Sequence, residues 1–484
     1  MESKKSLIKS LLTPAVIVAA LGYFVDIYDL LLFGIVRKGS LTDLGIVGEA
    51  NRDAGEFLIS MQMYGMLLGG ILWGILGDKK GRLNVLFGSI ITYSVANIAN
   101  GMVHSLEAYA LWRFIAGIGL AGELGAGITL VAETLPKNKR GYGTMIVASV
   151  GLIGAIVANL VYQTLQDWRV CYYAGGVLGL LLLALRFNVR ESIIYKEMAT
   201  KSPTKQKFFD GPLILLFASL MAVISAALIH EFVQDVWLRR ILYLVLGILF
   251  LILRYIINKS EKKLRKETAE ISRGGFVSIF TSRKMFVKYI QCIFIGISTW
   301  FVIGILITFS PEFAKFIGVQ GAETIMAGKS IAWAYMGLVL GDLTTGMLSQ
   351  KLKSRKKVMA IFLSMSLVMI FIYLHAGGVN STVFYLLCML LGFCNGYWVI
   401  FVTIAAEQFG TNIRATVTTT VPNFVRGSLP LIILGYQFFR DKTFSGNIIY
   451  ASMVMAVLLS TIAFVSLWKM KETFTADLDY TETV

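Results

Sequence analysis

Continuous apolar runs dominate the sequence, each about twenty residues long and bordered by short polar segments. As an α-helix, a run of this length is long enough to cross the hydrocarbon core of a bilayer. Apolar and polar residues do not alternate along the runs, which argues against a transmembrane β-barrel. With 56% hydrophobic and 15% charged residues, the chain has too little polar surface for a water-soluble domain. The sequence therefore predicts an all-α membrane protein.

Twelve of the runs form two sets of six, separated by a charged segment that begins at Arg190. The first six helices are predicted near residues 11–36, 57–76, 83–103, 108–132, 142–165 and 168–187. The second six are predicted near residues 286–309, 325–348, 358–376, 383–406, 415–438 and 447–468. Two further apolar runs lie between the sets, so the prediction is 14 transmembrane helices: two six-helix bundles plus an inserted two-helix hairpin.

These runs divide the chain into four parts. An N-terminal six-helix bundle is expected at 1–190 and a C-terminal six-helix bundle at 285–470, followed by a cytoplasmic tail at 471–484. Cytoplasmic linkers occupy 191–284 and carry the hairpin, at about 208–232 and 238–257. A short surface helix is expected at 261–270, where charged and apolar residues are interleaved.

Two pairs of segments indicate that one half of the chain repeats the other. The glycine-rich basic segment 74–82 is echoed at 346–355, and each joins two apolar runs. The segment 132–141 matches 406–415, with Ala, Glu, Asn and Arg in register. Both pairs occur in the same order and at nearly the same spacing, which is typical of the duplicated halves of secondary transporters.

Basic residues set the expected orientation. With the N-terminus inside, most of the 45 Lys and Arg residues fall in cytoplasmic segments, as the positive-inside rule requires. The C-terminus is then cytoplasmic too. The first run contains Asp26 and Asp29 and is too long for a signal peptide, so it is expected to be a retained helix. The net charge of +16 fits contact with anionic lipid rather than nucleic acid.

Cofactor chemistry is not indicated. Four cysteines lie inside apolar runs without the spacing of metal ligands or disulfide frameworks, so buried, unreactive thiols are expected. No motif suggests an ATPase. We therefore expect no enzymatic activity, no cofactor and no metal.

Several motifs carry a resemblance to a known family. The loop Gly74-xxx-Asp78-Lys79-x-Gly81-Arg82 resembles the signature between the second and third helices of the major facilitator superfamily. The segment 113–125, followed by Ala132-Glu133, Pro136 and Lys139-Arg140-Gly141, is similar to the metabolite:proton symporters of that superfamily. Asp26-Ile27-Tyr28-Asp29 resembles the Asp-x-x-Asp pattern of its aromatic-acid and phosphate symporters. The resemblance implies alternating access between two six-helix bundles; the extra hairpin departs from the usual twelve helices.

The resemblance also implies a conformational latch at the cytoplasmic face. Glycines allow a tight turn, and Asp78 can accept hydrogen bonds from the free amides of a neighbouring helix N-terminus. In the second half Gln350 replaces the carboxylate, so a weaker latch is expected there. The alternative is that these charges only mark topology. The candidate latch residues are Gly74, Asp78, Lys79, Gly81, Arg82, Glu133, Arg140, Glu407 and Arg414.

Charges inside the predicted helices point to transport, because each is costly in hydrocarbon and is normally retained for function. Asp26, Asp29 and Glu123 are the candidate proton carriers. Arg113 and Arg426 are the candidate anion-binding residues, since a guanidinium binds a carboxylate with two parallel hydrogen bonds. The alternative is structural: Asp29 and Arg113 would form an ion pair, and Glu123 would fix helix contacts.

Arg426 lies between Pro422 and Pro430, and prolines break helices where transporters bind substrate. Asn423 belongs to the same segment. Further polar and aromatic candidates for substrate contact, with ordinary helix packing as the alternative, are Tyr28, Gln62, Tyr64, Trp300, Asn395, Tyr397 and Trp398.

The leading hypothesis is a proton-coupled symporter that imports a small organic anion or metabolite. An exporter of drugs or organic cations is the alternative within transport, favoured by 14 helices but opposed by the two arginines. A receptor or scaffold without transport is the alternative from another class. The expected partners are a small-molecule substrate, protons and the bilayer, with no nucleic acid, and we expect a monomer in a bacterial inner membrane.

Overall fold

The computed structural model describes residues 13–80, 82–135, 140–186, 276, 278–410 and 413–474, with scattered positions between 237 and 251. This part of the chain is helical, and its β-structure consists of an isolated bridge between Gln320 and Asn380. The prediction of an all-α protein is confirmed.

The first half contains six membrane-length segments, one of which is broken. In the fourth segment, α5 ends at Leu120 and α6 begins at Glu123. The described helices of this half are α2 (Pro14–Asp43), α3 (Glu49–Lys80), α4 (Arg82–Asn100), α5 (Leu106–Leu120), α6 (Glu123–Thr134), α7 (Arg140–Leu165) and α8 (Trp168–Arg186).

The second half repeats this order with more interruptions. The membrane-length helices are α13 (Arg283–Phe301) continued by the π-helix η1 (Val302–Ile307), α15 (Ala327–Leu352), α16 (Arg355–Leu374), α17 (Ser381–Cys394) with α18 (Trp398–Glu407), α19 (Arg414–Gly427) with α20 (Leu429–Gln437), and α21 (Ile448–Lys469). Shorter elements are α12 (Ser278–Thr281), α14 (Ser310–Ile317), η2 (Ala322–Thr324) and the π-helix η3 (Phe438–Thr443).

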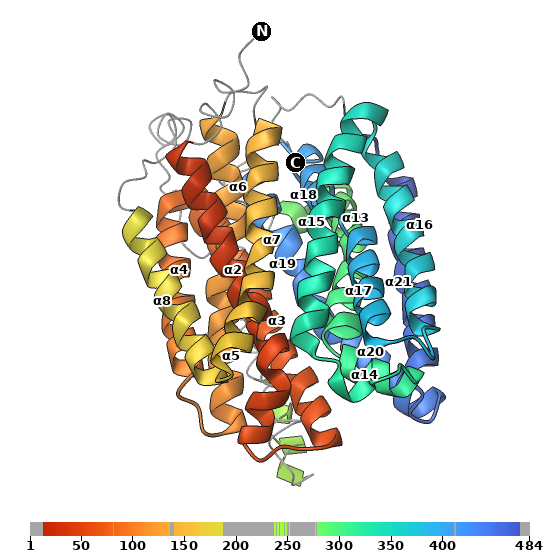
Figure 1. Cartoon of the computed structure of the whole chain (residues 1–484). Helices are drawn as coiled ribbons and strands as arrows, with labels where there is room; N and C mark the ends of the chain where they lie inside the picture. Colours follow the sequence, from red (N-terminus) through yellow and green to blue (C-terminus); the bar gives the residue numbers. More distant parts are fainter. Residues whose placement is uncertain are drawn as a thin grey trace.

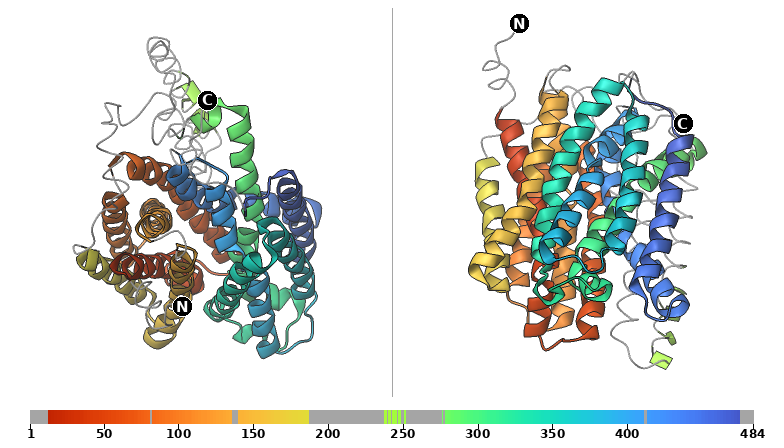
Figure 2. Two further views of the ribbon diagram at one scale, coloured as in Figure 1. Left: turned by 90° about the horizontal axis from the view of Figure 1, so that it is seen from above. Right: turned by 45° about the vertical axis from the view of Figure 1, so that its right-hand side comes forward.

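The two halves lie side by side. Helices α2 to α8 form one bundle and α13 to α21 the other (Figure 1), and the view along the bundle axes shows the same division (Figure 2). Helix α2 begins and α21 ends at the same end of the molecule, named here the terminal end; the other is the opposite end (Figure 1). The two helical bundles that the sequence predicted are therefore present.

Ten of the described segments are long and apolar enough to cross a membrane. The other two predicted helices fall short for different reasons: α4 carries several Asn and Ser residues, and α19 ends after 14 residues and contains Arg426. Most of the inserted hairpin, including 208–232, lies outside the described residues, as does the predicted surface helix 261–270. The positions described between 237 and 251 are helical, and their apolar side chains, among them Trp237, Leu244 and Leu251, are exposed.

Two seams join the halves, α3 against α19 and α7 against α15. Small residues allow the backbones to approach. A Cβ atom added to Gly70 would lie 2.6 Å from the Cβ of Asn423, and one added to Gly125 would lie 2.2 Å from Thr419 Oγ1. Larger residues at these two positions would force the halves apart at the terminal side of the centre.

Candidate functional site

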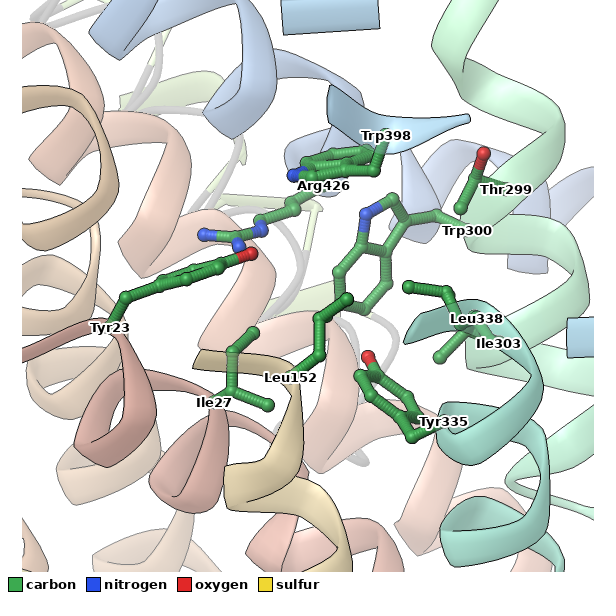
Figure 3. A pocket seen from close by; sticks show the side chains of 10 residues that line it. All are labelled: Tyr23, Ile27, Leu152, Thr299, Trp300, Ile303, Tyr335, Leu338, Trp398 and Arg426. Carbon is green, nitrogen blue, oxygen red and sulfur yellow. The ribbon is translucent and has the colours of Figure 1, made fainter. Parts of the chain in front are cut away.

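A small pocket lies between the halves, near the middle of the helices (Figure 3). Its free volume of about 20 Å³ is room for roughly one water molecule. The two halves are therefore contracted around this pocket. The lining residues are Tyr23, Ile27, Leu152, Thr299, Trp300, Ile303, Tyr335, Leu338, Trp398 and Arg426.

Arg426 provides the positive charge of the pocket. It lies one residue before the end of α19, in the segment that breaks at Ser428 ahead of Pro430, and it is 1% exposed. Its guanidinium carbon lies 5.8 Å from the ring centre of Trp300 and 5.7 Å from that of Trp398. Figure 3 shows the guanidinium beside both indoles and directed toward Tyr23. A cation surrounded by aromatic rings can bind a flat anionic group.

Asp26 of the first half faces this arginine. Its Oδ2 lies 4.0 Å from Arg426 Nη1, and both side chains are almost completely buried. Neither carboxylate oxygen has a hydrogen-bond partner among the described residues. The ion pair therefore joins the two halves without hydrogen bonds, and protonation of Asp26 would leave Arg426 available for another anion.

Asp29 and Arg113 lie inside the first bundle, away from the pocket. Arg113 donates to Gln62 Oε1, and its guanidinium lies over the rings of Phe33 and Tyr172. Asp29 packs against Gly175 of α8, where a Cβ would lie 2.1 Å from its Oδ1. The structure thus separates the five predicted charges: Asp26 and Arg426 form a pair across the halves, whereas Asp29, Arg113 and Glu123 lie in the first bundle without an ion pair between Asp29 and Arg113.

Glu123 and Asn423 meet at the break between α5 and α6. Glu123 is the first residue of α6, is 2% exposed and accepts from Ser89 Oγ at 3.3 Å. Asn423 of α19 donates to Ala121 O at 2.8 Å and so satisfies a carbonyl that the break leaves free. This contact holds the halves together on the terminal side of the pocket.

The other polar candidates are in the bundle interiors or at their edges. Tyr28 donates to Cys171 O, Tyr397 Oη lies 2.8 Å from Ser298 Oγ, and Asn395 donates to Ser366 Oγ at 3.0 Å. Tyr64 is half-buried and does not line the pocket. Of the predicted substrate contacts, Arg426, Trp300 and Trp398 line the pocket.

Sequence reasoning missed most of the lining, although one signal was available. Tyr23 lies three residues before Asp26 and therefore shares its side of α2, and Ile27 lies one helical turn after Tyr23. It also missed Asp342, a buried carboxylate in α15 whose Oδ1 accepts from the backbone N–H of Val399 at 3.2 Å. The predicted helix ended at 348, which places Asp342 near the membrane surface, whereas α15 continues to Leu352.

The predicted latch at the terminal end is described in part. Gly74 packs against α19, where an added Cβ would lie 3.3 Å from Thr420 Cγ2. Gly81 and the side chains of Asp78, Lys79, Arg82, Glu133 and Arg140 lie outside the described part. In the second half, Glu407 pairs with Arg355 at 3.3 Å, and Arg414 Nε donates to the carbonyls of Ala406 and Phe409.

A further contact of the second half was not predicted. Glu472, just after α21, accepts from Ser354 Oγ and from the backbone N–H groups of Arg355 and Lys356, and so caps the first turn of α16. Burial favours a higher pKa for this carboxylate, but these hydrogen bonds outweigh it, and the net effect lowers the pKa of Glu472.

Three ion pairs that sequence reasoning missed join the halves at the opposite end, the longest between Asp53 of α3 and Arg440 at 3.9 Å. Arg37 of α2 pairs with Glu312 of α14. Glu56 of α3 pairs with Arg440 of η3 at 3.1 Å and accepts from Gln437 Nε2 at 2.6 Å. With the contact of Asn423 on the other side, the halves touch on both sides of the pocket.

The four cysteines are free and buried, and no cluster of three or more His, Cys, Asp or Glu side chains that could hold a metal occurs within the described ranges. Neither observation points to metal or thiol chemistry at the pocket.

Comparisons with known proteins agree with this geometry. The model of the family described as Major Facilitator Superfamily matches residues 12–434. The chain is 31% identical over 199 residues to a Haemophilus influenzae protein named for metabolite transport. It is 29% identical over 181 residues to the niacin transporter NiaP of Acinetobacter baylyi, and 27% identical over 207 residues to a benzoate transport protein of the same organism.

The three alignments cover 40%, 37% and 40% of this chain, respectively. They cover 48%, 40% and 44% of the three relatives, so the chain spans less than half the length of each. Solved structures match over a greater length. The proton:xylose symporter XylE bound to 6-bromo-6-deoxy-D-glucose superposes with a TM-score of 0.63 over 96% of this chain and 97% of that one, at 16% identity. A double Trp mutant of XylE gives a TM-score of 0.64 at 14% identity. At this level of identity, the two structures show that the fold is shared.

Proposed function

The chain belongs to the Major Facilitator Superfamily, and we propose that it is a proton-coupled symporter that takes up a small organic anion by alternating access. The observation that carries this proposal is the ion pair of Asp26 and Arg426 across the two halves, in which Arg426 lines a pocket rich in aromatic rings.

The pair supports coupling through charge balance. While Asp26 is ionised, it neutralises Arg426 and competes with an anionic substrate for the guanidinium. A proton on Asp26 removes that competitor, so the proton and the anion bind together. Leaving either the arginine or the substrate carboxylate unpaired in a buried site is costly, so the half-loaded states are disfavoured.

The surroundings of Arg426 favour an anion with a flat apolar part. Trp300 and Trp398 lie beside the guanidinium, and Tyr23 and Tyr335 add two further rings. Similarity to proteins named for niacin and benzoate transport makes nicotinate and benzoate the first compounds to test. The same charge argues against organic cations as substrates, which were the alternative from sequence.

The remaining features complete the proposal. The terminal end is cytoplasmic, as the distribution of basic residues indicates, and the opposite end faces outward. The protein acts as a monomer in a bacterial inner membrane.

Asp29 and Glu123 are further proton-coupling groups inside the first bundle. The predicted glycine-rich segment is the latch that closes the cytoplasmic end when the transporter opens outward.

Counterflow tests the function directly. Purified protein in liposomes preloaded with unlabelled nicotinate or benzoate should accumulate the labelled compound, and an inward proton gradient should drive net uptake. Empty liposomes provide the control. Counterflow of organic cations but of no anion would support the exporter instead, and a folded protein that moves no member of a broad anion and cation panel would support a receptor or scaffold.

A further inference from the structure

We propose that Asp342 is a second proton-binding group of the transport cycle, one that belongs to the second half and lies at the base of the pocket. The inference rests on the proposed function but concerns a residue to which neither the sequence motifs nor the ion pair of Asp26 assigns a role.

The position of Asp342 is set by a broken helix. Helix α17 ends at Cys394, and α18 begins at Trp398, so the first amides of α18 have no partners within the helix. Asp342 Oδ1 accepts from one of them, the N–H of Val399, at 3.2 Å. Tyr397, the residue before α18, makes no capping hydrogen bond with its side chain. A carboxylate from a neighbouring helix therefore caps α18, where the helix dipole favours a negative charge.

Two neighbours of Asp342 fix this junction. Thr345 Oγ1 donates to Gly396 O at 2.9 Å. A Cβ on Gly341 would lie 2.8 Å from the Cα of Gly396, so only glycine allows α15 to lie so close to the break. The junction is thus tightly packed on α15, and Trp398, the first residue of α18, is directed into the pocket.

The second carboxylate oxygen of Asp342 distinguishes it from a simple cap. Asp342 is 1% exposed, and Oδ2 has no hydrogen-bond partner among the residues that the structure describes. A buried carboxylate with an unpartnered oxygen is expensive when ionised and much less so as the neutral acid. The contracted pocket therefore favours a proton on this group.

Few charged side chains lie around Asp342 to compensate for the charge of its ionised carboxylate. Tyr335 on α15 and Tyr23 on α2 lie within electrostatic range of Asp342. The same two hydroxyl groups lie within range of Asp26 and Arg426. Helices α7, α16, α17 and α18 also pack against α15, and no described Lys, Arg or His on them forms an ion pair with Asp342. The two tyrosines thus lie within electrostatic range of both Asp342 and the central pair.

The location beside the pocket gives this proton a role in the cycle. Leu338 lines the pocket one helical turn before Asp342, and Trp398 lines it next to the amide that Asp342 caps. Asp342 is therefore displaced from the pocket toward the terminal end. When that end opens, water reaches Oδ2, the α18 amides stabilise the carboxylate, and the proton leaves on the terminal side. Asp26 and Asp342 then carry one proton site in each half.

Infrared spectroscopy tests proton binding without a substrate. The acid-minus-alkaline difference spectrum of the purified protein should contain a C=O band of a buried carboxylic acid that Asp342→Asn removes. Asparagine keeps an oxygen that accepts from Val399, so the cap survives. Thr345→Val, which disturbs the same junction without removing an acid, should keep the band. An unchanged band in Asp342→Asn would overturn the proposal, whatever the substrate is.

Transport of labelled nicotinate in liposomes tests the coupling. Asp342→Asn should retain counterflow but lose the pH dependence of uptake. In the wild type, proton binding is expected to change the affinity for the substrate roughly 5–150-fold. Thr345→Val should retain that pH dependence. Wild-type coupling in Asp342→Asn, combined with loss of transport in Asp342→Ala, would show that the residue only caps α18. If wild-type protein does not transport nicotinate, the proposed substrate class is at fault, and the infrared band still decides the role of Asp342.

Discussion

The contact of Asp26 with Arg426 is long for an ion pair, and its length bears on function. At 4.0 Å the two groups attract each other without sharing a hydrogen bond, and Arg426 Nε has no partner among the described residues. A tightly hydrogen-bonded pair would have to lose two charge-assisted bonds before an anion could bind. The pair of Asp26 and Arg426 has no such hydrogen bonds to lose. Protonation of Asp26 can therefore release Arg426 to the substrate anion at moderate cost in free energy.

Replacing Asp26 with Asn should uncouple transport from the proton gradient. The amide cannot carry the proton, but its size is nearly the same, and Arg426 remains free to bind the anion. Uptake driven by a pH gradient should disappear, while exchange of internal for external substrate stays measurable in liposomes. Asp29→Asn is the companion variant. Gradient-driven uptake at wild-type rates in both variants would mean that neither carboxylate carries the proton.

Arg426→Lys should weaken substrate binding strongly although the charge is kept. Lysine loses the planar fork and its stacking against the two indoles. One lost hydrogen bond between charged groups costs about 1.5–3 kcal/mol, which corresponds to roughly a 10–150-fold rise in Kd. Binding measured by Trp fluorescence quenching should show this change. Arg169→Lys, at a partly exposed pair with Asp43, is the matched control and should bind normally. Equal affinity in the two variants would remove Arg426 from the substrate site.

At the scale of elements, the breaks in the helices position the polar groups. The α5–α6 break is satisfied from the other half by Asn423, whereas the α17–α18 break is satisfied within its own half by Asp342 and Thr345. The sequence predicted the interruption near Pro430 because proline marks it. The other two breaks contain Gly122 and Gly396 and no proline, and a hydrophobic run does not reveal where its backbone bonds are interrupted.

The opposite end should open when its ion pairs are removed. Glu56→Gln together with Glu312→Gln removes the two carboxylates that accept hydrogen bonds from arginines across the halves there and leaves the longer contact of Asp53 with Arg440. The equilibrium should therefore shift toward a pocket open at that end. A cysteine placed at Ile27 should then react faster with a membrane-impermeant thiol reagent added outside whole cells.

The matched control for this experiment is Glu323→Gln. Its pair with Lys315 is highly exposed and lies within the second half, so the reaction rate should not change. The four native cysteines are buried and should contribute little background. A rate that does not rise in the double variant would mean that these ion pairs do not hold the opposite end closed.

Glu472 should make stability depend on pH at the terminal end. Its pKa is lowered in the folded protein, so its contribution is present above the unfolded value of about 4.5 and is lost as the pH falls through the folded pKa. Glu472→Gln should therefore lower Tm at pH 7, and the difference from wild type should shrink below about pH 4.5. Thermal unfolding in detergent at several pH values checks this. A constant difference across that range would indicate a role that does not depend on charge.

For the molecule as a whole, the sequence predicted the architecture well and the site less well. Run length and hydrophobicity are local properties, so the helix ranges agree with the structure to within a few residues at most ends. Which side chains meet depends on how two bundles pack, and this is not local. Trp300 and Trp398, which were predicted as substrate contacts, lie beside Arg426, whereas Asp29 and Arg113 lie inside one bundle.

The inserted hairpin gives the last test, because the two bundles form a complete fold without it. Its two predicted helices enter and leave on the same side, so removal keeps the second bundle in the same orientation. The described positions between 237 and 251 expose apolar side chains, as expected for a helix in contact with lipid. None of these described positions lines the pocket. We therefore expect that replacing 208–257 with a flexible linker of about 30 residues, long enough to join the bundles as a random coil, leaves substrate binding intact. Binding to monodisperse protein is the measurement, and its loss would mean that the hairpin packs into the transport path.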